Sequence, residues 1–99
     1  ILITSSNEYN VLKSIAIDII NKKLSPCTHI INNVESFYLW NDNAVDDNEN
    51  LLLIKCKQAN ISEIEKIINA KHNYEIPEII SHEFNIISNK YKKWFDKLK

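Results

Sequence analysis

The sequence contains no glycine, no methionine and no arginine, and two of these absences exclude whole classes of site. Without glycine there is no glycine-rich loop of the kind that cradles a phosphate group. Without arginine no guanidinium can hold a phosphate or a carboxylate through two parallel hydrogen bonds, so lysine must act as a point charge instead. Nucleotide binding through a phosphate loop is therefore excluded.

The sequence also has few cysteines, a small net charge and no long apolar run. The two cysteines, Cys27 and Cys56, form no CxxC motif and no disulfide-rich pattern, which favours a reducing compartment. A net charge of -1 gives no electrostatic reason for the whole domain to bind nucleic acid. No apolar run approaches the length of a membrane span. We expect a cytoplasmic protein, or an organellar one if a targeting segment was removed upstream.

The length and the apolar pattern predict one domain over residues 1–99 with four strands and three helices. The first half should contain a strand at 1–4, a helix that starts with a Ser5/Glu8 capping box and runs to about Lys23, and a strand at 27–40 with an irregularity at Asn32-Asn33. A turn at 41–43 and a strand at 51–56 should follow. The rest should form a helix capped by Asn60 that ends near Lys71, a strand at 74–84 and a helix that starts at Ser88-Asn89. This order is typical of an α+β, ferredoxin-like βαββαβ sandwich with an added C-terminal helix.

The segment that follows the second predicted helix contains the most informative residues. Along an extended chain, Glu78 lies on the same face as Ile76 and Ile80, so its carboxylate either loses water or meets another surface. A surface glutamate on the rim of the sheet is the alternative. Pro77 has no N–H group to donate, which favours an edge strand, and an edge strand can pair with another chain.

Aromatic residues near the tip of the predicted hairpin indicate an interface. Tyr38 and Trp40 are costly to expose on a monomer, so we expect them to pack against a neighbouring subunit. Packing onto the C-terminal helix through Tyr91 and Trp94 is the second possibility. The lysines between residues 90 and 99 favour a solvated helix face over contact with an anionic surface.

A cysteine and a histidine lie two residues apart in the second predicted strand. Cys27 and His29 face the same side of an extended chain, so a thiolate and an imidazole could share a soft metal such as Cu(I) or Zn(II). Two ligands do not make a metal site, and free cysteine usually behaves as a small apolar residue. A buried thiol beside a hydrogen-bonded histidine is therefore the favoured interpretation.

The pattern from residue 1 to 98 resembles the CutA family, which is named for divalent cation tolerance. The residues that carry the resemblance are His72, Tyr74-Glu75, the run Ile76-Pro77-Glu78-Ile79-Ile80, Ser36-Phe37-Tyr38-Leu39-Trp40, Leu51-Leu52-Leu53-Ile54-Lys55, Tyr91 and Trp94. The resemblance implies a ferredoxin-like, PII-like homotrimer. We expect the interface positions at Tyr38, Trp40, Tyr74, Pro77 and Trp94.

The same resemblance implies a metal-related function. In CutA proteins the equivalents of His72 and Glu78 lie in a cleft between subunits and are associated with copper, in some members together with a cysteine where this chain has Thr4. We therefore expect copper or another divalent cation to bind weakly at His72 and Glu78, with Cys27 and His29 as the rival pair.

Other function classes fit the sequence less well. No nucleophile has a base at motif spacing, so we expect no enzyme. An acylphosphatase of the same topology needs an arginine, and an RNA-recognition module needs a basic surface and a glycine-containing strand motif. A PII-like or ACT-like small-molecule sensor, signalling to an unidentified partner, is the alternative to the metal hypothesis.

Overall fold

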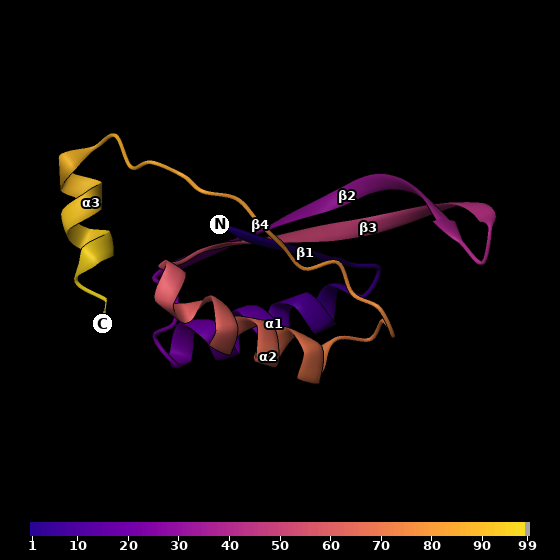
Figure 1. Ribbon diagram of the computed structural model, residues 1–99, viewed down its shortest axis with the longest axis horizontal. Coiled ribbons are helices and arrows are strands. Elements are labelled where there is room, and N and C mark those ends of the chain that lie inside the picture. The colour runs from indigo at the N-terminus through magenta and orange to yellow at the C-terminus, as the bar shows by residue number, and fades with distance from the viewer. Residues whose placement is uncertain (99) are drawn as a thin grey trace.

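The computed structural model describes residues 1–98, which form four strands and three α-helices in the predicted order (Figure 1). The elements are β1 (Leu2–Ser6), α1 (Tyr9–Asn21), β2 (Cys27–Trp40), β3 (Asn43–Lys55), the 3-10 turn η1 (Gln58–Asn60), α2 (Ile61–Lys71), β4 (Ile80–Ser81) and α3 (Asn89–Asp96). Within this part of the chain, no helix combines the length and the apolar character needed to cross a membrane.

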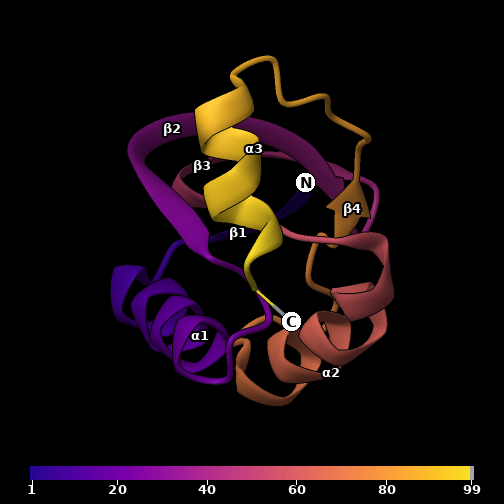
Figure 2. The same cartoon turned by 90° about the vertical axis from the view of Figure 1, so that its left-hand side faces the viewer.

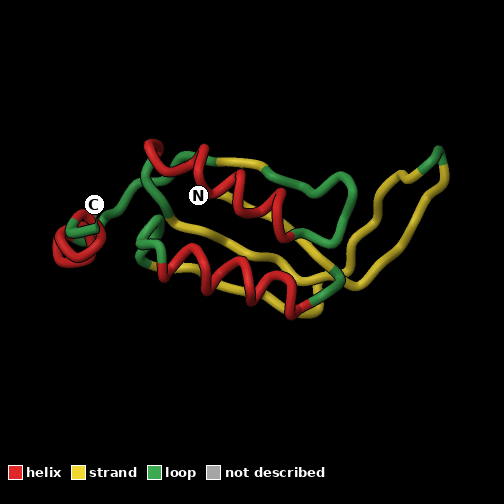
Figure 3. Tube along the Cα trace, turned by 90° about the horizontal axis from the view of Figure 1, so that it is seen from below, coloured by secondary structure: helices red, strands yellow, loops and turns green. Residues whose placement is uncertain are grey.

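The strands form one antiparallel sheet in the order β2-β3-β1-β4, which confirms the ferredoxin-like topology. Helices α1 and α2 lie side by side on one face of the sheet (Figure 1, Figure 3). The molecule measures 46 × 26 × 20 Å because the β2–β3 hairpin extends far beyond the two helices. The hairpin tip and α3 therefore lie at opposite ends (Figure 1, Figure 3).

The hydrophobic core lies between the sheet and the helices α1 and α2. Alternate residues of β1 and β3 face the helices, and the helices contribute residues three or four positions apart. The buried residues of this cluster are Leu2, Leu12, Ile15, Ala16, Ile19, Leu52, Ile54, Cys56, Ile64, Ile67 and Ile68. Burying each large aliphatic side chain is worth about 1.5–3 kcal/mol, so this cluster is the main source of stability within one chain.

The hairpin is shaped by asparagine and aspartate in place of glycine. Asn41 and Asp42 both have positive φ, at 50° and 64°, as a two-residue hairpin turn requires. A register shift lies between Ile31 and Val34, where Asn33 has φ of 60°. These features confirm the predicted turn and the predicted irregularity, because short polar side chains tolerate the left-handed region better than other residues.

Two of the three predicted helix caps differ from the prediction. Ser5 belongs to β1 and pairs with β3, and the N-cap of α1 is Glu8, so the predicted capping box is wrong. The neighbouring Ser6 instead accepts a hydrogen bond from the Glu8 backbone N–H, at 3.0 Å. Asn60 is at the N-cap of α2, but its side chain donates to the Leu24 carbonyl at 3.1 Å. Ser88 caps α3 as predicted.

The strand predicted over residues 74–84 is largely wrong. Only Ile80 and Ser81 pair with β1. Two backbone hydrogen bonds between Ile1 and His82, one in each direction, add one more residue pair to this contact. Strand β1 has five residues, but β4 pairs with only two of them, because residues 74–78 leave the edge of β1 and line the cleft beside the hairpin. β4 is an edge strand, as predicted, and Pro77 lies in the irregular segment before it.

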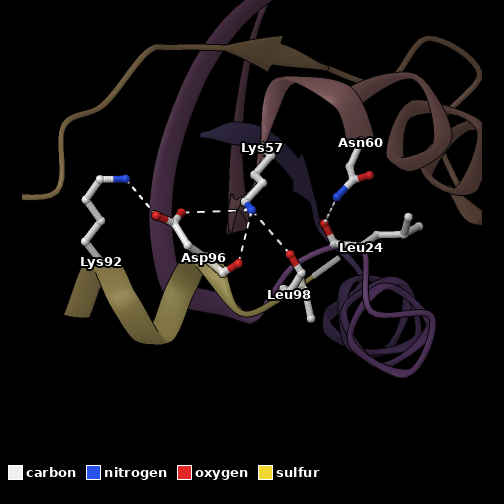
Figure 4. A network of polar contacts seen from close by, with 6 residues as sticks. All are labelled: Leu24, Lys57, Asn60, Lys92, Asp96 and Leu98. Carbon is white, nitrogen blue, oxygen red and sulfur yellow. Dashed lines mark hydrogen bonds and ion pairs between the residues drawn. The ribbon is translucent and has the colours of Figure 1, made fainter. Parts of the chain in front are cut away.

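Helix α3 lies at one end of the sheet (Figure 2), where polar contacts and one buried ring attach it. The Lys57 ammonium donates to the backbone carbonyls of Asp96 and Leu98, at 3.4 and 3.3 Å, and Lys92 pairs with the Asp96 carboxylate at 2.7 Å (Figure 4). Phe95 is 4% exposed, whereas Trp94 is 47% exposed. The predicted apolar face of this helix is therefore only partly buried within one chain.

Candidate functional site

A cleft of about 660 Å³ lies between the hairpin and the segment that follows α2. The hairpin contributes residues 36–40, Val45, Glu49 and Leu51, and the segment contributes residues 74–78; Ser5 of β1 completes the lining. The structure thus brings together Tyr38, Trp40, Tyr74, Pro77 and Glu78, all of which the sequence singles out. His72 lies directly behind this wall and is not part of the lining.

The cleft is acidic and aromatic. Its carboxylates are Glu49, Glu75 and Glu78, and none of the described lining residues is a lysine, an arginine or a histidine. Glu75 and Glu78 are exposed, whereas Glu49 is only 6% exposed. An uncompensated cluster of negative charge beside aromatic rings attracts cations and repels anions.

Glu49 is held by Tyr74 across the cleft wall. The Tyr74 hydroxyl donates to Glu49 Oε2 at 2.5 Å and accepts a hydrogen bond from the Asn7 backbone N–H at 2.8 Å. Burial raises the pKa of Tyr74, and the hydrogen bond to Glu49 raises that pKa further, so the phenol stays protonated. Glu49 was not identified from the sequence, since its partner lies 25 residues away and no local pattern connects the two.

Both ring nitrogens of His72 make hydrogen bonds within the chain. Nδ1 accepts from the Tyr74 backbone N–H at 2.9 Å, so the proton is on Nε2, which donates to the Ser5 carbonyl at 2.8 Å. Burial lowers the pKa of His72, which keeps the imidazole neutral. Coordination of a metal by either nitrogen would have to break one of these hydrogen bonds.

Further hydrogen bonds attach the same segment to the end of β1. Ser6 Oγ donates to Asn73 Oδ1 at 2.6 Å, and Asn73 Nδ2 donates to Asn7 Oδ1 at 3.0 Å. We call this set of contacts the clasp; it consists of His72, Asn73 and Tyr74 on one side and Ser5, Ser6, Asn7 and Glu49 on the other. The clasp fixes the point from which residues 75–78 leave to form one wall of the cleft.

The aromatic residues of the hairpin line the cleft without being covered. Tyr38 donates to Asp47 Oδ2 at 3.3 Å. Phe37 is 71% exposed, and Tyr38 and Trp40 are 38% and 44% exposed. The alternative that Tyr38 and Trp40 pack onto the C-terminal helix of the same chain is wrong, because α3 lies at the other end of the molecule (Figure 1).

The rival pair lies outside the cleft. Cys27 Sγ and His29 Nε2 are 3.5 Å apart at the start of β2, so the predicted proximity is present. Among the residues described, no group of three or more histidine, cysteine, aspartate or glutamate side chains could hold a metal ion. Cys27 and His29 thus offer two donors, and His72 and Glu78 are not joined into a larger ligand set within one chain.

The residues present do not fit a copper centre in a single chain. Thr4 is fully buried, and its hydroxyl has no hydrogen-bond partner among residues 1–98, but a hydroxyl is not a soft ligand. The nitrogens of His72 are engaged, and the cleft offers only carboxylate oxygens as charged donors. Carboxylates suit a weakly held divalent cation whose other ligands are waters or groups from another chain.

Comparison with known proteins agrees with the resemblance. Residues 1–98 match the family model described as CutA1 divalent ion tolerance protein. The chain is 35% identical over 82 residues to the chloroplastic protein CutA of Arabidopsis thaliana, which covers 83% of this chain and 45% of that protein. It is also 30% identical over 94 residues to the divalent-cation tolerance protein CutA of Thermus thermophilus. That match covers 95% of this chain and 90% of the Thermus protein.

Solved structures show the same fold. The divalent cation tolerance protein of Thermus thermophilus superposes with a TM-score of 0.91 at 25% identity, over 98% of this chain and 94% of that chain. CutA1 from Oryza sativa superposes with a TM-score of 0.90 at 28% identity, over 97% of this chain and 88% of that chain. The chain spans about half the length of the plant proteins that it matches in sequence.

Proposed function

This chain belongs to the CutA1 family of divalent ion tolerance proteins, and from that membership we propose that it acts as a homotrimer that holds a divalent cation weakly in the cleft beside Glu78. The family match favours this function over that of an ACT-like small-molecule sensor. The observation that carries the proposal is the cleft with three carboxylates and no cationic side chain among its described lining residues.

Glu78 is the ligand in this proposal, and His72 is a positioning residue. Glu78 lines the cleft and is exposed, so its carboxylate can bind a hydrated cation without breaking an existing contact. His72 holds the Tyr74 backbone, and Tyr74 holds Glu49, so the histidine sets the position of the acidic wall. One or two carboxylates per subunit predict weak binding, with water or a neighbouring subunit completing the shell.

The surface of the hairpin end supports assembly. Phe37, Leu39 and Ile76 are each at least 70% exposed in one chain, and they surround the cleft. Contiguous apolar surface of this kind marks an interaction site in a water-soluble protein. Strand β2 is also an edge of the sheet, which leaves a long row of backbone groups free to pair with another chain. The expectation of three subunits in the assembly comes from the family resemblance.

Calorimetric titration with ZnCl₂, MnCl₂ and CuCl₂ tests the cation site. We expect Glu78→Gln to weaken binding at least about tenfold, which corresponds to about 1.4 kcal/mol, without lowering the melting temperature. Glu65→Gln, which changes an exposed carboxylate on α2, is the matched control and should leave the affinity unchanged. His72→Ala should lower both the affinity and the melting temperature, because the clasp is lost.

The outcomes separate the possible sites. Equal affinity in wild type and Glu78→Gln would contradict the proposed ligand. Loss of binding in Cys27→Ser alone would move the site to β2. If titration of the wild type gives no heat of binding with any of the three metals, cation binding in the cleft is refuted.

A further inference from the structure

Cys27 and His29 form a thiol–imidazole pair on the face of the sheet that is turned away from α1 and α2. They are separated by one residue of β2, so their side chains project to the same side, and Sγ lies 3.5 Å from Nε2. Cys27 is half-buried and His29 is exposed. A nucleophile and a base within hydrogen-bond reach, in contact with solvent, are the elements of an activated thiol.

A fixed cation lies across the strand from this pair. Lys55 is the direct cross-strand partner of Cys27, and partners in an antiparallel ladder project to the same face. The Lys55 ammonium donates to the Tyr91 hydroxyl at 3.0 Å and lies 5.1 Å from the centre of the Tyr91 ring, which keeps the lysine over the sheet. The hydrogen bond to Tyr91 raises the pKa of Lys55, and the nearby Cys27 contributes a smaller increase.

We propose that Cys27 is a nucleophilic thiol that forms mixed disulfides with low-molecular-weight disulfides, with His29 as its base and Lys55 stabilising the thiolate. In the step, the Cys27 thiol proton moves to His29 Nε2 and the sulfur attacks one sulfur of the small disulfide. The S–S bond of the reagent breaks, and the leaving thiolate takes up the proton. A protein thiol and a disulfide thus become a protein mixed disulfide and a small thiol.

The second cysteine provides an internal contrast. Cys56 is 6% exposed and belongs to the hydrophobic core, and burial raises the pKa of its thiol. A thiol in such surroundings forms little thiolate and is closed to reagents. The chain therefore carries one thiol arranged for reaction and one arranged for packing. The reactive one lies outside the cation cleft, so this inference does not depend on cation binding there. It rests on the proposed function in one respect: this face of β2 must stay open to solvent in the homotrimer.

Thiol-exchange kinetics on the purified full chain test the proposal. The probes are the anionic disulfide dithiobis(nitrobenzoate) and the cationic disulfide cystamine, and peptide mapping locates the adduct. We expect one fast thiol, Cys27, that reacts faster than free glutathione, while Cys56 reacts only after unfolding in guanidinium. His29→Gln should slow Cys27 about tenfold or more, because the base is lost. His82→Gln, an exposed histidine elsewhere, should have no effect.

The charge of the probe separates activation from simple exposure. Lys55→Gln should reduce the preference for the anionic over the cationic disulfide, whereas an exposed but unactivated thiol would show the same preference in both proteins. Two results would overturn the proposal: a Cys27 rate in the native protein no higher than that of glutathione, or a rate that His29→Gln leaves unchanged.

Discussion

The two ends of the hairpin strands contain the same kinds of apolar residue and bury them very differently. Where β3 lies over α1 and α2, Leu52 and Ile54 are completely buried. Beyond the irregularity between Ile31 and Val34, Leu39 is 75% exposed and Trp40 is 44% exposed. One chain thus completes the core at the helix-covered end and leaves the cleft end open.

The difference indicates where stability and function reside. A core that is closed within one chain can fold without a partner, whereas an apolar surface that surrounds an acidic cleft gains free energy only when another surface covers it. The clasp fixes one wall of that cleft to β1, so this wall is held in place by contacts within one chain. We infer that the helix-covered end supports the fold and that the hairpin end supports assembly and ligand binding.

The largest effect is expected in the closed core. Leu52→Ala leaves a cavity among fully buried side chains and should lower the free energy of unfolding by about 4 kcal/mol. Because this contact lies within one chain, the loss should be the same at every protein concentration. Urea denaturation at two concentrations measures it, and a loss that appears only in the assembled protein would contradict the division into two ends.

The next effect concerns the open end. Trp40 is 44% exposed in one chain, and in the proposed assembly we expect a neighbour to cover its ring. Trp40→Ala should then cost on the order of 3 kcal/mol per subunit in the assembled protein. The melting temperature of the wild type should therefore rise with protein concentration, and that of the variant should rise less. An unchanged melting temperature would mean that the indole is simply exposed.

The clasp should contribute less than either of these. Tyr74→Phe removes the hydroxyl that donates to the buried Glu49 and accepts from the Asn7 N–H, and we expect a loss of about 2 kcal/mol. Adding Glu49→Gln should recover part of the loss, since the unpaired buried charge is removed. Tyr9→Phe, on the exposed side of α1, is the control. A loss in Tyr74→Phe no larger than in the control would exclude the hydrogen bond as a stabilising contact.

The smallest effect is expected from titration of His72. Burial lowers its pKa below the ordinary value of 6.5, so the folded protein favours the neutral ring more than the unfolded chain does. The contribution of His72 to the free energy of unfolding is fully present above pH 6.5. It is lost as the pH falls through the lowered pKa that His72 has in the folded protein. Urea midpoints of wild type and His72→Gln should therefore differ less at low pH than at neutral pH, and a constant difference would contradict this assignment.

Local patterns were sufficient to predict most of the fold. The Asn41-Asp42 turn and the Ser88 cap depend on neighbouring residues, and both are present. The capping role of Ser5 and the long fourth strand were predicted wrongly, since each depends on how far β1 pairs with its neighbours. The fourth strand is short because residues 74–78 line the cleft instead of continuing beside β1, and that choice is not written in the strand's own sequence.

The cleft was predicted only in part for the same reason. Tyr38, Trp40 and Glu78 were recognisable because aromatic or charged residues at those positions are costly without a partner. Glu49 was missed because its buried contact with Tyr74 joins two elements that the sheet brings together. The engagement of both His72 nitrogens likewise depends on the carbonyl of Ser5, which no local pattern identifies.

Light scattering coupled to size-exclusion chromatography tests the central claim, that the hairpin end is completed by other copies of the chain. At micromolar concentration we expect a particle of three times the 11.6 kDa of one chain for the wild type and a shift toward the monomer for Trp40→Ala. A wild-type particle with the mass of a single chain would contradict the claim, because the exposed apolar surface around the cleft would then have no partner.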